Sequence, residues 1–233
     1  VVVLGMGRSG TSFLSRFLAE CGVYVDEVSD KYEHAGARRI NDSILAELFG
    51  ARPGLPYGKL PPDEIEVSEN WHARAMEFIE YMDKRASESG SLPYWAFKDP
   101  RTTVLHKLWI RHFDIVVGIF RSPEQVVESY MAKRLVGGWR RRRKALDYWL
   151  RVNQSRLEVW KSVQGVKPMY VVDYNGDIPA QTSRLCARLG IQVTDRARAV
   201  FSKTENHFSS VPPIADEAVL QLYQSLLGTR NLL

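Results

Sequence analysis

The sequence begins with Val1-Val2-Val3-Leu4-Gly5-Met6-Gly7-Arg8-Ser9-Gly10-Thr11-Ser12, a run of apolar residues followed by a glycine-rich segment. Its apolar start is typical of a buried β-strand, and apolar side chains then recur at helical spacing over residues 13–21 until Gly22. The glycines between strand and helix let the backbone turn so that successive N–H groups point into one concavity. A helix that begins near Ser9 or Gly10 adds the positive end of its dipole. The stretch therefore predicts a strand, an anion-binding loop and a helix.

The spacing of Gly5 and Gly10 matches the phosphate loop of nucleoside triphosphatases, but the residues that follow differ. The Walker pattern requires Lys and then Ser or Thr, whereas this chain has Thr11-Ser12 and carries its cation at Arg8. A kinase or GTPase needs that lysine on the β- and γ-phosphates. The loop is therefore suited to phosphate but not to ATP chemistry, and a plain glycine-rich turn is the structural alternative.

Composition places the chain among ordinary globular proteins. It has 233 residues, of which 45% are hydrophobic and 25% charged, so we expect one domain over residues 1–233. The apolar runs are too short to span a bilayer, which predicts a cytoplasmic protein, although a chain that starts inside a strand leaves room for an upstream targeting or anchor segment. A net charge of +5 favours anionic ligands but is too small to indicate nucleic acid. Cys21 and Cys186 fit core positions, and the histidines form no ligand-spaced cluster, so we expect no metal.

Strand patterns alternate with helical patterns along the chain. Further strands are expected at residues 94–97, 113–120 and 169–172, and helices at 35–48, 71–82, 102–112, 123–131, 146–160, 178–189 and 215–227. This alternation predicts a P-loop-like α/β fold, a three-layer α/β/α arrangement around a mostly parallel sheet of four or five strands. Ligands of such sheets bind at the carboxyl ends of the strands, where residues 7–12, Lys98 and Arg121 would lie.

Arg121 follows the strand over 113–120, and Ser129 comes eight positions later. With this second motif in place, the sequence resembles the PAPS-dependent sulfotransferases, especially the bacterial and heparan-type members, over most of residues 1–190. Residues 8–12 match the family's K/R-S-G-T-[ST] loop, which implies that Gly7, Arg8, Ser9, Gly10, Thr11 and Ser12 bind the 5′-phosphosulfate. Arg121 and Ser129 match the family's pair that holds the 3′-phosphate. The resemblance implies transfer of a sulfuryl group from PAPS to a hydroxyl- or amine-bearing acceptor, a saccharide, lipid or small molecule, with release of PAP.

The same resemblance suggests which residues carry the chemistry. Sulfuryl transfer needs a base for the acceptor's proton and positive charge on the leaving phosphate oxygen, and we assign Arg8 to the leaving side. Lys98 is a candidate for the sulfonyl or bridging oxygen, with a surface lysine paired to Asp99 as the alternative. Glu33 resembles the F-E element that supplies the catalytic carboxylate in heparan-type members, with a carboxylate that caps the next helix as the alternative. His34 is the second candidate base.

Three further features stay open. Tyr174 resembles the tyrosine of the family's Y-E-D element near the adenine, although strand-end packing explains it equally well. The basic run over residues 140–144 follows Gly137-Gly138 and is either a solvated helix face or a mobile clamp for PAPS or an anionic saccharide. The chain has no clear counterpart of the family's R-K-G-x-x-G-D-W segment, and the loop over residues 51–62 is a candidate part of the acceptor pocket. Two other functions compete, a Mg²⁺-dependent P-loop nucleotide kinase and a non-catalytic module that binds anionic glycans.

Overall fold

The computed structural model describes residues 1–25, 33–50, 67–90, 92, 94–132, 139–201 and 213–229. The elements in chain order are β1 (Val2–Leu4), α1 (Thr11–Glu20), α2 (Ala35–Phe49), α3 (Glu69–Glu88), β2 (Phe97–Lys98), η1 (Pro100–Thr103), α4 (His106–Trp109), η2 (Ile110–His112), β3 (Val116–Phe120), α5 (Pro123–Ala132), α6 (Trp139–Val163), β4 (Met169–Asp173), α7 (Ile178–Leu189), α8 (Asp195–Phe201) and α9 (Glu217–Gly228). Among the helices in these ranges, none combines the length and the apolar character needed to cross a membrane.

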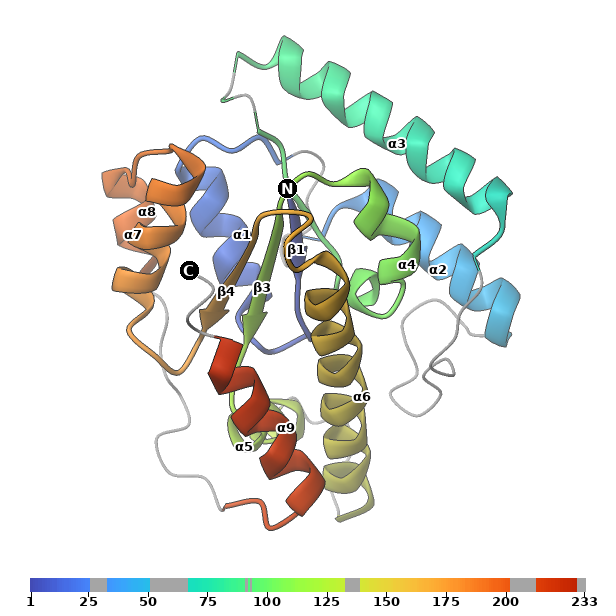
Figure 1. Cartoon of the computed structure of the whole chain (residues 1–233), viewed down its shortest axis with the longest axis vertical. Helices are drawn as coiled ribbons and strands as arrows, with labels where there is room; N and C mark the ends of the chain where they lie inside the picture. Colours follow the sequence, from blue (N-terminus) through green and yellow to red (C-terminus); the bar gives the residue numbers. More distant parts are fainter. Residues whose placement is uncertain are drawn as a thin grey trace.

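The strands form one four-stranded parallel sheet in the order β2-β1-β3-β4. Val3 of β1 lies opposite Lys98 of β2 on one side and Val117 of β3 on the other. Because all strands run the same way, their carboxyl ends meet at one edge of the sheet (Figure 1). The predicted α/β fold with a parallel sheet of this size is confirmed.

Alternate residues of the strands bury their side chains on opposite faces of the sheet, as the strand period of two requires. Val3, Val117 and Val172 pack with the apolar side chains of α1, α7 and α8. Val2 and Val116 pack on the other face, with α2, α3, α4 and the end of α6. Figure 1 shows these helices on the two sides of the sheet. Burial of each apolar side chain of this size stabilises the folded state by about 1.5–3 kcal/mol, so the helices on both faces of the sheet add to its stability.

The single helix expected over residues 102–112 was wrong, because that segment is broken into η1, α4 and η2. Asp99 caps the first turn by accepting a hydrogen bond from the N–H of Arg101 at 2.8 Å. At the other end, the ammonium of Lys167 donates to the backbone carbonyls of Ile110, Arg111 and Phe113. These bonds satisfy carbonyls at the end of the segment, which have no partner within a helix, where the chain turns toward β3.

Helix α8 was not predicted, and its sequence explains why. It has seven residues, of which Ala197 and Val200 are the buried members, so its apolar pattern covers less than two turns.

The predicted core position of both cysteines is confirmed. Cys21 and Cys186 are buried free thiols whose Sγ atoms lie 3.9 Å apart between α1 and α7. Within the described ranges, no group of three or more His, Cys, Asp or Glu residues is placed to hold a metal ion.

Candidate active site

The loop between β1 and α1 is held in shape by hydrogen bonds to its own backbone and to η1. The N–H of Gly5 donates to Thr103 Oγ1 at 2.9 Å. The N–H and the hydroxyl of Ser9 both donate to the carbonyl of Met6, at 3.2 and 2.6 Å. Ser9 is therefore used inside the loop, and its side chain stabilises the turn that exposes the neighbouring residues.

Gly10 occupies a position that only glycine fits. It is the N-cap of α1 with a φ of 95°, in the left-handed region, and a Cβ atom there would lie 2.3 Å from the ring of Tyr174. Because the cap residue has no side chain, it accepts no side-chain hydrogen bond from the first turn of α1. The cap residue therefore leaves the first N–H groups of α1 without a side-chain cap, an arrangement that suits the anion site that the sequence predicts.

Replacement of Gly10 by alanine should destabilise the protein more than the same change at Gly190. Both glycines have a positive φ, which costs an alanine about 1–2 kcal/mol, but nothing lies within 4 Å of the Cβ position at Gly190. The contact with Tyr174 should cost Gly10→Ala a further 1–3 kcal/mol or so. Urea unfolding of the two variants measures the difference. Equal losses would contradict the close packing of Tyr174 on the loop.

A second cationic group lies beside this loop, at the ends of β3 and β4. Arg121 follows β3 and is 7% exposed, and its Cζ atom lies 5.0 Å from the centre of the Tyr174 ring. Tyr174 follows β4, and its N–H donates to the carbonyl of Phe120 at 2.8 Å. The Nε of Arg8 donates to Ser129 Oγ at 2.8 Å. Arg8 thus joins the predicted loop to Ser129, while the Nε of Arg121 donates to Gln125 Oε1 at 2.7 Å.

The charges at this point favour an anion. Burial lowers the pKa of the Arg121 guanidinium, Tyr174 opposes that shift, and the positive charge of Arg8 lowers the pKa further. Burial raises the pKa of the Tyr174 phenol, so the ring stays neutral beside the two arginines. In the described part of the chain, Arg8 forms no salt bridge. Two neighbouring cations, one of them desolvated, are stabilised when an anion binds between them.

A third group of predicted residues meets at the carboxyl end of β2. Lys98 is 2% exposed, and its Nζ lies 3.6 Å from Glu33 Oε1 and 3.3 Å from Ser12 Oγ. The alternative of a surface lysine paired to Asp99 is wrong, because the side chain is buried. The carboxylate of Asp99 instead accepts from Arg101 Nη1, at 2.8 Å to each oxygen. The Glu33 carboxylate and the Lys98 ammonium therefore lie together, and Ser12 connects the ammonium to the start of α1.

His34, the second candidate base, caps α2. Its Nδ1 accepts a hydrogen bond from the N–H of Gly36 at 2.9 Å, so the capping role considered for Glu33 belongs to its neighbour. The ring is 1% exposed and packs edge-on against Phe78, with ring centres 4.9 Å apart. A histidine that uses one nitrogen as a cap has less freedom to accept a proton than the carboxylate beside it.

Comparisons with known proteins give the family of the chain and the similarity of its fold. Residues 1–195 match the model of the sulfotransferase family. The chain belongs to that family. The sulfotransferase domain of the Synechococcus PCC 7002 olefin synthase has a similar fold, with a TM-score of 0.61 and 17% identity over 97% of this chain and 93% of that one. Sulfotransferase STF9 from Mycobacterium avium gives a TM-score of 0.48 and 12% identity over 98% and 76% of the two chains. None of the curated proteins searched matches the sequence.

Several residues that support the candidate site were not predicted. Arg101 joins Asp99 to Asp42, whose Oδ1 lies 2.8 Å from Arg101 Nε, and so links the end of β2 to α2. The hydroxyl of Tyr130 donates to the carbonyl of Gly7 at 3.2 Å. No sequence motif includes Thr103 or Tyr130. Arg101 belongs to the charged run over residues 98–101, but only Lys98 of that run was predicted to act in the site.

The basic run of the sulfotransferase is partly neutralised within the fold. Arg142 forms an ion pair with Glu128. Arg143 lies 3.0 Å from Asp147 and 3.1 Å from Asp216. Residues 137 and 138, the side chains of residues 140 and 141, and the loop over residues 51–62 lie outside the described residues. The described arginines of the run therefore support the interpretation as a helix face better than that as a free clamp.

Proposed function

We propose that this sulfotransferase moves a sulfuryl group from PAPS to a hydroxyl or amine acceptor and releases PAP. The observation that carries the proposal is the hydrogen bond from Arg8 to Ser129, which joins the loop after β1 to the residues after β3. A nucleotide with phosphates on both its 5′ and 3′ positions needs two anion sites close together. The start of α1 suits one phosphate, and Arg121 with Ser129 suits the other. The ring of Tyr174, which contacts both sites, offers an apolar face for the adenine.

The group at the end of β2 suits the transfer step. Glu33 takes the proton from the acceptor's hydroxyl or amine as the acceptor atom bonds to sulfur. The bond between sulfur and the 5′-phosphate oxygen breaks, and the electron pair stays on that oxygen of PAP. Lys98 lies between Glu33 and Ser12, where it stabilises negative charge on the transferred group, and Arg8 does the same on the leaving side.

The competing functions have less support. A Mg²⁺-dependent kinase needs a lysine after Gly10 and an acidic residue near the end of β3, and this chain has Thr11 and Arg121 there. A module that only binds anionic glycans does not require a general base, so that function leaves the buried Lys98–Glu33 pair beside the phosphate loop unexplained. The described part of its basic run already binds carboxylates of the protein.

Thermal unfolding with nucleotides tests the proposal. PAP at about 100 times its dissociation constant should stabilise the protein by about 2.7 kcal/mol, which corresponds to about 5–10 °C in melting temperature for a domain of this size. ATP with Mg²⁺ should give a smaller shift, and EDTA should not change the effect of PAP. A larger shift with ATP and Mg²⁺ would favour the kinase. No shift with PAP, together with salt-sensitive glycan binding, would favour the binding module.

A further inference from the structure

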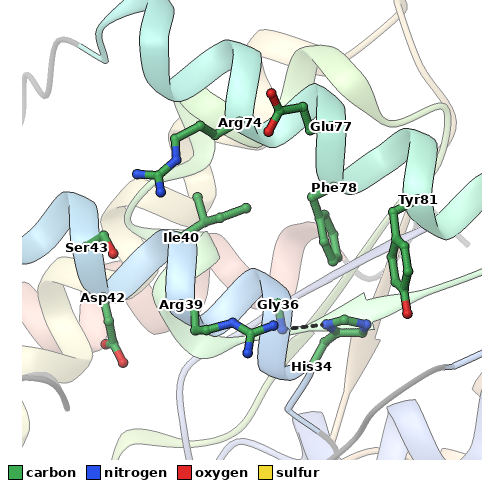
Figure 2. A pocket seen from close by; sticks show the side chains of 10 residues that line it. All are labelled: His34, Gly36, Arg39, Ile40, Asp42, Ser43, Arg74, Glu77, Phe78 and Tyr81. Atoms are coloured by element: carbon green, nitrogen blue, oxygen red, sulfur yellow. Dashed lines mark hydrogen bonds between the residues drawn. The ribbon is translucent and has the colours of Figure 1, made fainter.

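A groove lies between α2 and α3 (Figure 2). Its volume of about 860 Å³ is within the range of sites that bind small molecules. His34 and Phe78 contribute buried surface to it, while Arg39, Arg74 and Tyr81 are exposed at its rim. The groove therefore combines a flat aromatic surface with charged groups, as binding sites for small polar molecules do.

One end of the groove adjoins the candidate base. His34, which lines the groove, directly follows Glu33 in the chain. The N–H of His34 donates to the carbonyl of Lys98 at 3.3 Å, and the ammonium of Lys98 lies 3.6 Å from Glu33. Glu33 itself is not among the residues that line the groove, so the link between the groove and the carboxylate that we assign to proton removal is the single peptide that joins Glu33 to His34.

The carboxylates of the groove do not balance its cations. Asp42 lines the groove but is already held by two arginines, with Arg101 Nε at 2.8 Å and Arg38 Nε at 3.6 Å. Glu77 is the remaining carboxylate among the described lining residues. Arg39 and Arg74 also line the groove, so among the described residues its cations exceed the one carboxylate that no arginine neutralises.

The two guanidinium groups are placed to bind a ligand. Among the described residues, Arg39 has neither a salt bridge nor a hydrogen bond through its side chain, and in Figure 2 it extends toward His34. Arg74 stacks on the ring of Trp71 at 4.8 Å, which leaves its N–H edges available. In Figure 2 it reaches from α3 toward α2, away from Glu77.

We propose that this groove binds the acceptor, and that the acceptor carries a carboxylate or phosphate group that Arg39 and Arg74 bind. The inference rests on the proposed function, because it assigns the groove to the molecule that Glu33 deprotonates. The hydroxyl of the acceptor lies at the His34 end, and its ring or hydrocarbon part packs on Phe78 and Tyr81. Guanidinium groups bind carboxylates and phosphates through paired hydrogen bonds, which neutral alcohols do not offer.

Calorimetric titration of matched acidic and neutral compounds tests this inference. The pairs are glucuronic acid and glucose, glucose 6-phosphate and glucose, and 4-hydroxyphenylacetate and its amide. Each is titrated with and without saturating PAP. At least one acid should bind about tenfold or more tightly than its neutral partner, and the carboxylate and phosphate arms show which anion is preferred. The double variant Arg39→Ala/Arg74→Ala should lose this preference, whereas Lys84→Ala, an exposed cation of α3 outside the groove, should keep it.

Two outcomes would overturn the inference. One is equal behaviour of acids and neutral partners in every pair, including no binding by either. The other is an acid preference that survives the double variant. PAP binding is measured in the same titrations. If the proposed function is wrong but the groove binds acids, the wild type will not bind PAP and will still prefer the acids.

Discussion

Replacement of Glu33 by glutamine should lower turnover with PAPS by about 10²–10⁴-fold and leave PAP affinity within a few-fold of the wild type. The amide keeps the size of the side chain but no longer takes a proton from the acceptor. Glu33 is 15% exposed and its Oε1 lies 3.6 Å from Lys98 Nζ, so it is accessible and has its charge partner in place. Transfer of labelled sulfate from PAPS measures the turnover, and calorimetry measures the PAP affinity.

Glu80→Gln is the matched control, because it makes the same change at an exposed position of α3. It should keep full turnover. If Glu33→Gln also keeps full turnover, Glu33 has no part in the chemistry. If PAP affinity falls with turnover, Glu33 supports the nucleotide site through Lys98, and His34 becomes the base to test.

Replacement of Arg121 by alanine should weaken PAP binding by about 2–5 kcal/mol, which is roughly 30-fold to several thousand-fold in dissociation constant. The variant leaves the 3′-phosphate in a desolvated position without its cation. Arg151→Ala, an exposed arginine of α6, should bind PAP as the wild type does. Circular dichroism of both variants shows whether the fold is kept.

The elements that the sequence predicted best are those whose apolar pattern is local. The strands expected over residues 113–120 and 169–172 are apolar apart from Asp114, as strands buried on both faces require, and both are present as β3 and β4. The loop after β1 was predictable because its glycines are needed for one backbone shape. The prediction of one helix over residues 102–112 was wrong where non-local contacts matter, since the end of that segment is held by Lys167, which comes from a distant part of the chain.

The candidate site was predictable as a set of residues but not as an arrangement. Motif spacing named Arg8 and Arg121, and the end of an expected strand named Lys98, while their contacts depend on which strands pair. Lys98 is buried beside Glu33 because β2 pairs with β1, and no local pattern contains that information. The bond from Arg8 to Ser129 likewise follows from the order of β1 and β3.

If one nucleotide occupies both anion sites, as we propose, the protein should distinguish PAP from adenosine 5′-phosphate, which lacks the 3′-phosphate. Calorimetry should show that the wild type binds PAP more tightly by about 2–5 kcal/mol. Arg121→Ala should bind the two compounds almost equally, because the cation that distinguishes them is gone. Equal binding of the two compounds by the wild type would contradict the assignment of Arg121 and Ser129 to the 3′-phosphate, and with it the proposed sulfuryl donor.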